Sequence, residues 1–257
     1  MIKQLLDEAA SVKNTLDNLY SHPDPLQVVY DNINHKDIEF IALICALFAY
    51  GNAGAIVKFL KKLDFSLLDK SDNEIKELNN LYRFQSSQDV AQIFISLKRF
   101  KEKTSIKDFS HKIYKSSKEN KLLNVIYAFI NEIYSLNDYR SAGYEFFFSK
   151  VNKTSAYKRY CMYYRWMVRN DNLDLGLFDE INPADLLMPL DTHTHKMGLK
   201  LGLITRKQAD QKCMLELSKA LREFCPNDPL KYDFALYRIS QTNDEKALNE
   251  LIKNARS

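Results

Sequence analysis

Lys158 and Asp191 are the two residues whose types could act together in covalent catalysis, and each stands where a helix is expected to begin. Lys158 opens the segment Tyr160 to Arg169, whose aromatic and long side chains favour a helix over a loop. Asp191 follows Met188-Pro189-Leu190 and precedes an apolar periodic run, the pattern of a helix N-cap. The pair would supply an amine nucleophile and a carboxylate.

Lys158, Met162 and Arg165 share one face of the expected helix, because residues i, i+4 and i+7 lie on the same side. The opposite face is apolar or aromatic and is expected to pack in the core: Tyr157, Cys161, Tyr164 and Val168. An amine attacks carbon only when neutral, and desolvation or the neighbouring cations Arg159 and Arg165 would favour that form. A simpler interpretation stays open, with a solvated Lys158 and an Asp191 that only caps a helix, worth about 1 kcal/mol.

Length and composition limit the class of fold. A chain of 257 residues with 46% hydrophobic content can bury a sizeable core, as one domain or as two lobes. Six glycines, six prolines and no period-2 runs between turn clusters predict an all-α protein. A net charge of +4 is compatible with a polyanion partner but does not indicate one.

The cysteines and the hydropathy of the chain predict the cellular compartment of the protein. Four cysteines stand singly, which argues against a disulfide framework or a paired-cysteine metal site and favours a reducing cytoplasm. Met1 to Tyr20 has the apolar spacing of one amphipathic helix rather than a signal sequence. No stretch reaches about eighteen uncharged apolar residues, so a soluble cytoplasmic protein without a membrane partner is expected.

The remaining chain is expected to form helices separated by clear breaks. The prolines of Ser21 to Pro25 begin a new unit, because they disfavour helix before them. Asp37 to Lys62 predicts a helix, a glycine break and a second helix. The aromatic stretch 142–148 predicts the first arm of a helical hairpin, and the polar turn 151–154 leads into the Lys158 helix. A further amphipathic helix is expected over Arg206 to Phe224.

Three segments together resemble the helix-hairpin-helix DNA glycosylase superfamily: the Lys158 helix, Pro189-Leu190-Asp191-Thr192-His193 and Lys231-Tyr232-Asp233-Phe234-Ala235-Leu236-Tyr237. The resemblance is nearest to the archaeal-type 8-oxoguanine DNA glycosylases, by way of a bacterial family of uncharacterised proteins with that fold. It implies a two-lobed all-α fold with a cleft between the lobes. Residues 25–137 would form a helical lobe, and residues 1–24 and 138–257 the lobe that carries the hairpin.

The resemblance also implies an activity. In the superfamily a hairpin lysine attacks the sugar C1′ and an aspartate at the start of a later helix assists, and Lys158 and Asp191 match these positions. This implies a base-excision-repair DNA glycosylase with AP lyase activity. Such an enzyme would remove an oxidised purine, with 8-oxoguanine as the expected one, from double-stranded DNA, and its reaction would pass through a Schiff base. Two alternatives stay open: a glycosylase for another damaged base such as an alkylated purine, and a non-catalytic DNA-binding module.

Substrate-binding residues follow from the same resemblance. Asp233 matches a position that contacts the purine edge, where a carboxylate accepts from the N1 and N2 donors. Tyr237, one turn later, matches an aromatic residue that stacks on the flipped base. Asn52 resembles a polar residue at the end of an early helix that reaches into the duplex or base pocket. Met162 and Arg165 are expected to line the site because they share the helix face of Lys158. Purely structural roles stay open for Asp233, Tyr237 and Asn52.

The hairpin departs from the usual pattern. The Leu-Pro-Gly-Val-Gly sequence, whose glycines let amides approach a phosphate, is replaced by Val151-Asn152-Lys153-Thr154-Ser155. Lys153, the hydroxyls of Thr154 and Ser155 and the amides of the next helix would contact the phosphate instead.

Neither a cofactor nor a metal is expected, and the chain is expected to act as a monomer. Cys213 and Cys225 are too few for the four-cysteine iron–sulfur cluster that some members of the superfamily carry. His193 and His195 are two residues apart, which points them in different directions on a helix.

Overall fold

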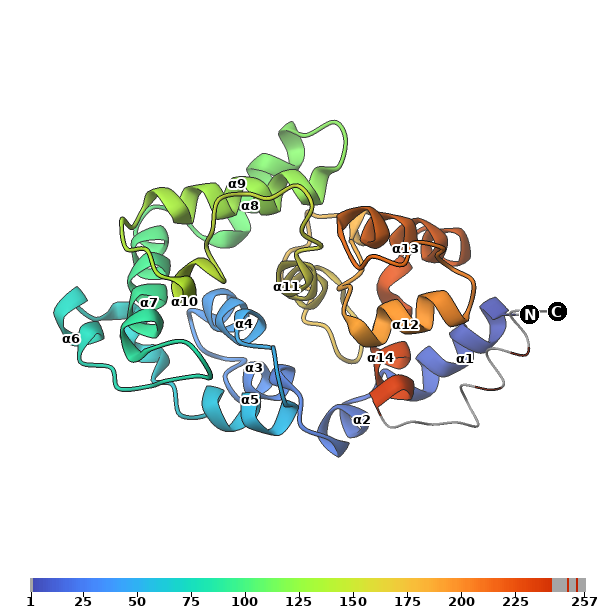
Figure 1. Cartoon of the computed structure of the whole chain (residues 1–257), viewed down its shortest axis with the longest axis horizontal. Helices are drawn as coiled ribbons and strands as arrows, with labels where there is room; N and C mark the ends of the chain where they lie inside the picture. Colours follow the sequence, from blue (N-terminus) through green and yellow to red (C-terminus); the bar gives the residue numbers. More distant parts are fainter. Residues whose placement is uncertain (1, 242–248, 250–252, 254–257) are drawn as a thin grey trace. The chain divides into compact units, whose positions relative to one another are not determined.

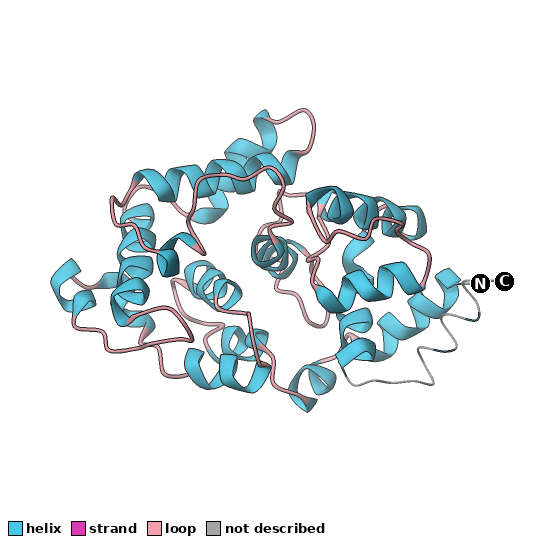
Figure 2. Cartoon of the chain, viewed as in Figure 1, coloured by secondary structure: helices cyan, strands magenta, loops and turns pink. Residues whose placement is uncertain are grey.

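The structure, a computed structural model, describes residues 2–241, 249 and 253. In these residues α-helices and short 3-10 helices are joined by loops and turns, with no strand (Figure 2). The predicted all-α class is confirmed. None of the described helices combines the length and apolar character that crossing a membrane requires.

The chain folds as two compact units and passes between them twice. Unit 1 contains the described residues of Met1–His22 and Lys153–Ser257, and unit 2 contains Pro23–Asn152 (Figure 1). The first change falls in the proline-rich connector, next to the expected start at residue 25. The second falls between Asn152 and Lys153 rather than after Asn137, so residues 138–152 belong to unit 2.

Unit 2 has a core built on an apolar central helix. Its elements are α3 (Pro25–Asp31), α4 (Ile38–Leu47), α5 (Ala53–Leu60), η1 (Phe65–Asp69), α6 (Asp72–Lys76), α7 (Ser87–Lys101), α8 (Ile106–Ser116), α9 (Lys121–Ser135) and α10 (Ala142–Glu145). Every residue from Phe40 to Leu47 is buried, as expected of a helix that is apolar on all sides. Phe100 of α7 makes edge-on contacts with Phe40, Phe109 and Phe129, which joins α4, α7, α8 and α9.

Unit 1 is built around α11. Its elements are α1 (Ile2–Lys13), α2 (Leu16–Ser21), α11 (Lys158–Val168), η2 (Pro183–Asp185), α12 (Thr192–Lys200), α13 (Gln211–Phe224), η3 (Pro229–Tyr232) and α14 (Asp233–Gln241). From Tyr160 to Val168 every α11 residue except Met162 is buried. Helix α14 packs against α1 and α12 (Figure 1). These contacts bring α1, from the start of the chain, beside α14.

The predicted break between Asp37 and Lys62 is confirmed. Helix α4 ends at Leu47 and α5 begins at Ala53. Between them Gly51 has φ +102°, a conformation that glycine adopts without steric cost.

Two predicted helices were too long, because polar side chains form caps inside them. The single helix Met1 to Tyr20 is two helices: Thr15 accepts from the N–H of Asn18 at 3.2 Å and starts α2. The helix predicted from Arg206 starts at Gln211, because Asp210 caps it by accepting from the N–H of Cys213 at 3.0 Å.

The predicted helical hairpin differs most from the structure. The aromatic stretch 142–148 is helical only over Ala142–Glu145, and the chain is irregular from Ser149 to Tyr157. Its two arms fall in different units, α10 in unit 2 and α11 in unit 1.

Candidate active site

Lys158 and Asp191 meet in unit 1. Lys158 is the first residue of α11 and Asp191 is the N-cap of α12, so both predicted helix starts are confirmed. Nζ of Lys158 lies 3.3 Å from Oδ2 of Asp191, and the two side chains are 33% and 16% exposed. The loop and the 3-10 helix between α11 and α12 thus return the chain so that the amine and the carboxylate face each other at a partly open position.

The Asp191 carboxylate is fixed by its own helix. Oδ1 accepts from the N–H groups of His193 and Thr194 at 2.8 and 2.9 Å, and the Thr194 hydroxyl accepts from the Asp191 N–H at 2.8 Å. Burial disfavours charge on Asp191, but Lys158 and the Thr194 amide outweigh it, so its pKa lies below the ordinary value. Asp191 is therefore an ionised carboxylate at neutral pH.

Arg165 is buried and paired with two carboxylates. Nη1 donates to Oδ2 of Asp233 at 2.6 Å, while Nε and Nη2 donate to Oδ1 of Asp174 at 3.3 and 3.2 Å. The sequence predicted Arg165 as a neighbouring cation that would favour a neutral Lys158, and the structure shows that the charge of Arg165 is balanced by two carboxylates. The buried guanidinium of Arg165 holds the side chains of Asp174 and Asp233 in place.

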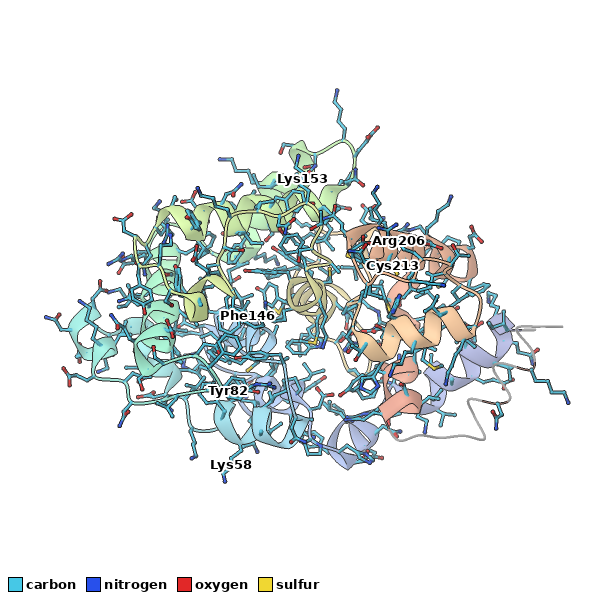
Figure 3. The ribbon with its side chains drawn as sticks, viewed as in Figure 1. Lys58, Tyr82, Phe146, Lys153, Arg206 and Cys213 are labelled. Atoms are coloured by element: carbon cyan, nitrogen blue, oxygen red, sulfur yellow. The ribbon has the colours of Figure 1, made fainter. Side chains whose placement is uncertain are left out.

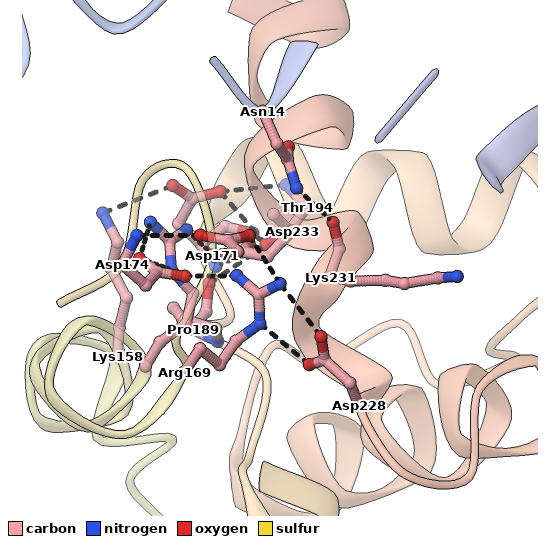
Figure 4. A network of polar contacts seen from close by, with 12 residues as sticks. Asn14, Lys158, Arg169, Asp171, Asp174, Pro189, Thr194, Asp228, Lys231 and Asp233 are labelled. Carbon is pink, nitrogen blue, oxygen red and sulfur yellow. Dashed lines mark hydrogen bonds and ion pairs between the residues drawn. The ribbon is translucent and has the colours of Figure 1, made fainter. Parts of the chain in front are cut away.

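A second arginine extends this buried ionic network. Arg169 donates to Asp174 and Asp171, and its Nε and Nη2 bind both oxygens of Asp228 at 2.8 and 3.0 Å (Figure 4). Asp171 in turn accepts from the N–H of Leu173 at 2.8 Å. The network joins the end of α11, the loop after it and the turn before α14, so the helix that begins with Lys158 is held at its far end by charge-assisted bonds.

Asp233 is the first residue of α14 and is only 4% exposed, so it is a buried carboxylate and not a surface acid. Oδ2 is bound by Arg165, whereas Oδ1 makes no hydrogen bond within the described residues. Burial raises the pKa of Asp233, and Arg165 opposes that shift. One oxygen of a buried carboxylate is thus available to accept a hydrogen bond.

Tyr237 is half-buried one turn further along α14 and lies next to the start of α12. The His193 ring meets it edge-on, with centroids 6.1 Å apart and planes at 87°. Nδ1 of His193 also lies 2.9 Å from Oγ of Ser240. His193 is two residues from Asp191, so these contacts place Tyr237 on the side of α14 that faces the α12 cap. Met162, also half-buried, is one turn after Lys158.

A family model described as "Protein of unknown function (DUF2400)" matches residues 24–242. The chain belongs to this family. The DUF2400 match includes Lys158, Asp191, Arg165 and Asp233, and it begins after α1 and α2. Comparison with curated proteins and with solved structures gave no match.

In this DUF2400 chain the three predicted phosphate-binding residues precede α11. Lys153 and Thr154 are exposed and Ser155 is half-buried (Lys153 is labelled in Figure 3). The Thr154 carbonyl accepts from the N–H of Gln211 at 2.9 Å, which ties this loop to the start of α13. Tyr157, which follows, has φ +47°, so the chain enters α11 through a left-handed residue without a side-chain cap.

Asn52 belongs to unit 2, whereas Lys158 and Asp191 belong to unit 1. It does not end a helix as predicted but begins one: its side chain accepts from the N–H of Ala55 at 3.1 Å and caps α5. The Asn52 side chain has a structural role in unit 2, and a role in base binding stays a prediction.

The described residues contain no group of three or more His, Cys, Asp or Glu side chains placed to hold a metal ion. His195 directs Nε2 to the carbonyl of Arg206 at 3.0 Å, while His193 contacts Ser240.

An exposed aromatic turn in unit 2 was missed by the sequence analysis. Tyr82 and Gln85 pair through their backbones, Arg83 between them has φ +56°, and Phe84 is 54% exposed. Phe84 packs edge-on against Phe146, which is 40% exposed (Tyr82 and Phe146 are labelled in Figure 3). The run Leu-Tyr-Arg-Phe between polar residues was the available signal, since rings and a cation together favour stacking ligands.

Proposed function

We propose that the chain is a DNA glycosylase with AP lyase activity that removes an oxidised purine, 8-oxoguanine, from double-stranded DNA. The observation that carries the proposal is the 3.3 Å distance between Nζ of Lys158 and Oδ2 of Asp191, at the starts of two helices. Within the proposal, unit 1 is the catalytic lobe of a helix-hairpin-helix glycosylase fold.

The chemistry assigned to the pair is nucleophilic displacement. The unprotonated amine of Lys158 forms a bond to C1′ as the glycosidic bond breaks, and the base leaves with the electron pair and takes up a proton. The nitrogen lone pair then forms a double bond to C1′ as the C1′–O4′ bond breaks, and O4′ takes up a proton from water, which gives a protonated Schiff base. Removal of a C2′ proton by a base then expels the 3′ phosphate with its bonding electrons. An ionised Asp191 suits stabilisation of the positive charge that develops on the sugar.

Base recognition is assigned to α14. Oδ1 of Asp233 can accept one hydrogen bond from a purine N–H, and burial strengthens that bond because little water competes. Tyr237, at i+4, offers a ring on the same side of the helix. One acceptor and one stacking surface are what a flipped purine requires.

DNA contacts are assigned to both units. The exposed Lys153 and Thr154 suit a phosphate, as an ammonium and a hydroxyl are common phosphate partners. In unit 2 the turn with Arg83 and Phe84 suits stacking with an unpaired base, which rings and guanidinium planes both support.

The test is borohydride trapping on duplex DNA that contains 8-oxoguanine. Wild type should give a covalent adduct, Lys158→Ala should give none, and Asp191→Asn should give much less. Lys196→Ala, which changes an exposed lysine of α12, is the matched control and should behave as wild type. No adduct with wild type, or an undiminished one with Lys158→Ala, would overturn the lyase assignment.

Base-release and binding measurements with the same variants, on duplexes that carry other damaged bases, separate the two alternatives. A glycosylase for an alkylated purine would release that base without an adduct and would need Asp191 but not Lys158. A DNA-binding module would bind every duplex without releasing any base, and Asp191→Asn would leave its binding intact.

A further inference from the structure

The start of α14 is held by a residue far away in the sequence. Asp7 of α1 binds two consecutive residues that immediately precede Asp233: its Oδ1 lies 2.5 Å from Nζ of Lys231 and accepts from the Tyr232 hydroxyl at 2.9 Å. Tyr232 is fully buried. Asn14, at the end of the same helix, donates from Nδ2 to the Lys231 carbonyl at 2.8 Å (Figure 4).

The N-terminal helices also hold α14 one turn beyond its start. Arg238, buried on α14, donates from Nη2 to the carbonyl of Leu19 at 3.2 Å. Leu6 of α1 and Leu19 of α2 are themselves buried, so this contact rests on packed apolar side chains. Contacts with α1 and α2 therefore hold the chain both before and after the two residues assigned to base recognition, Asp233 and Tyr237.

The DUF2400 match begins at residue 24, so Asp7 and Asn14 lie before the matched range whereas Lys231, Tyr232 and Asp233 lie within it. Lys158 and Asp191 stand on α11 and α12, and their pairing uses none of the groups that Asp7 binds. The anchor and the reacting pair are thus separate sets of contacts.

We propose that α1 is a specificity element, in which Asp7 is a positioning residue that sets Asp233 and Tyr237 for recognition of the purine. The inference rests on the proposed function and deepens it. Asp7 touches neither the base nor the reacting atoms. It acts by fixing η3, and with it the first turn of α14.

The hydrogen bond between Asp7 and Tyr232 ties η3 to α1, so loss of either partner frees this segment, and loss of Asp7 also leaves a buried hydroxyl without its acceptor. A displacement of about 1 Å at a substrate-positioning group can lower a rate about 100-fold. Removal of Asp7 should therefore slow any reaction that requires recognition of the purine and leave unchanged the rate of a reaction that does not.

An abasic site provides that second reaction, because it has no base to recognise and still offers C1′ to Lys158. The experiment compares release of 8-oxoguanine with borohydride trapping on abasic-site duplex for Asp7→Ala and Tyr232→Phe. Tyr232→Phe keeps the ring and removes only the hydroxyl, which covers the case in which Asp7→Ala does not fold. Lys3→Ala is the matched control, since Lys3 binds the same carboxylate at 2.8 Å from within α1.

Both test variants should release 8-oxoguanine at least tenfold more slowly and trap the abasic site within twofold of wild type, while Lys3→Ala should match wild type on both. An equal fall on the two substrates, or unchanged release, would overturn the positioning role alone. A wild type inactive on both substrates would overturn the proposed function, and this inference with it.

Discussion

Asp191 divides its two carboxylate oxygens between its own helix and Lys158. Oδ1 accepts from two amides at the start of α12, while Oδ2 lies 3.3 Å from Nζ of Lys158. Since each role uses a different oxygen, the cap and the charge can be separated by substitution.

Asp191→Asn should lower base release about 100-fold or more while leaving the fold intact, because it keeps a capping oxygen and removes the charge. The free energy of unfolding should fall by no more than about 1 kcal/mol, the scale of a partly exposed ion pair. Single-turnover release and urea unfolding measure the two effects. Asp210→Asn, at the N-cap of α13, is the control and should not affect release. A fully active Asp191→Asn would contradict the assignment.

The pairing of Asp191 should also appear in the pH dependence of stability. Its pKa in the folded chain is below the ordinary aspartate value, despite burial, because of Lys158 and the Thr194 amide. A lowered pKa contributes stability that is complete above the unfolded value, about 4, and is lost as the pH falls through the folded value. The difference in unfolding free energy between wild type and Asp191→Asn should be constant from about pH 5 to 7 and shrink below about pH 4. A difference that grows in acid would show that the sign is wrong.

Arg165→Met should destabilise unit 1 by about 3–5 kcal/mol, since it leaves the buried carboxylates of Asp174 and Asp233 without this partner. Arg206→Met removes a side chain that is 35% exposed from its pair with Asp210, and should destabilise unit 1 far less, because solvent screens this pair. Urea unfolding followed by circular dichroism compares the two. Equal costs would mean that the buried network contributes no more than a surface ion pair.

Phe84→Ala should weaken binding to DNA with an unpaired base by about 5- to 150-fold, the range expected when one stacking contact of about 1–3 kcal/mol is lost. Thermal stability should change little, because the ring is largely exposed. Val12→Ala removes an apolar side chain of α1 that is 63% exposed, against 54% for Phe84, and should leave binding unchanged. Fluorescence anisotropy measures both, and an equal effect of the two substitutions would exclude a specific role for Phe84.

The helical class and the starts of α11 and α12 could be predicted from the sequence because they depend on local signals. An aspartate after a proline and before apolar periodicity forms a cap, and Asp191 does so. The prediction of a helix over residues 142–148 was wrong, because the apolar content of a segment does not determine how long its helix is. The chain leaves the helix after Glu145, and Phe147 and Phe148 are buried outside it.

The partners of Arg165 could not be predicted because they depend on long-range contacts. Its helical face suggested a neighbour of Lys158, yet the side chain reaches Asp233, 68 positions further along the chain. The residues of the Phe84 turn were overlooked for a similar reason, as only the fold brings Phe146 against them.

The contact between Asp7 and Tyr232 joins residues 225 positions apart, on either side of the whole of unit 2. During synthesis α1 therefore leaves the ribosome long before α14 is made. The apolar side of α1, which includes Leu6, stays exposed to solvent or bound to a chaperone while unit 2 is synthesised. Unit 2, as one continuous stretch, can fold during that interval. Unit 1 can therefore be completed only after the elements from α11 to α14 have been synthesised.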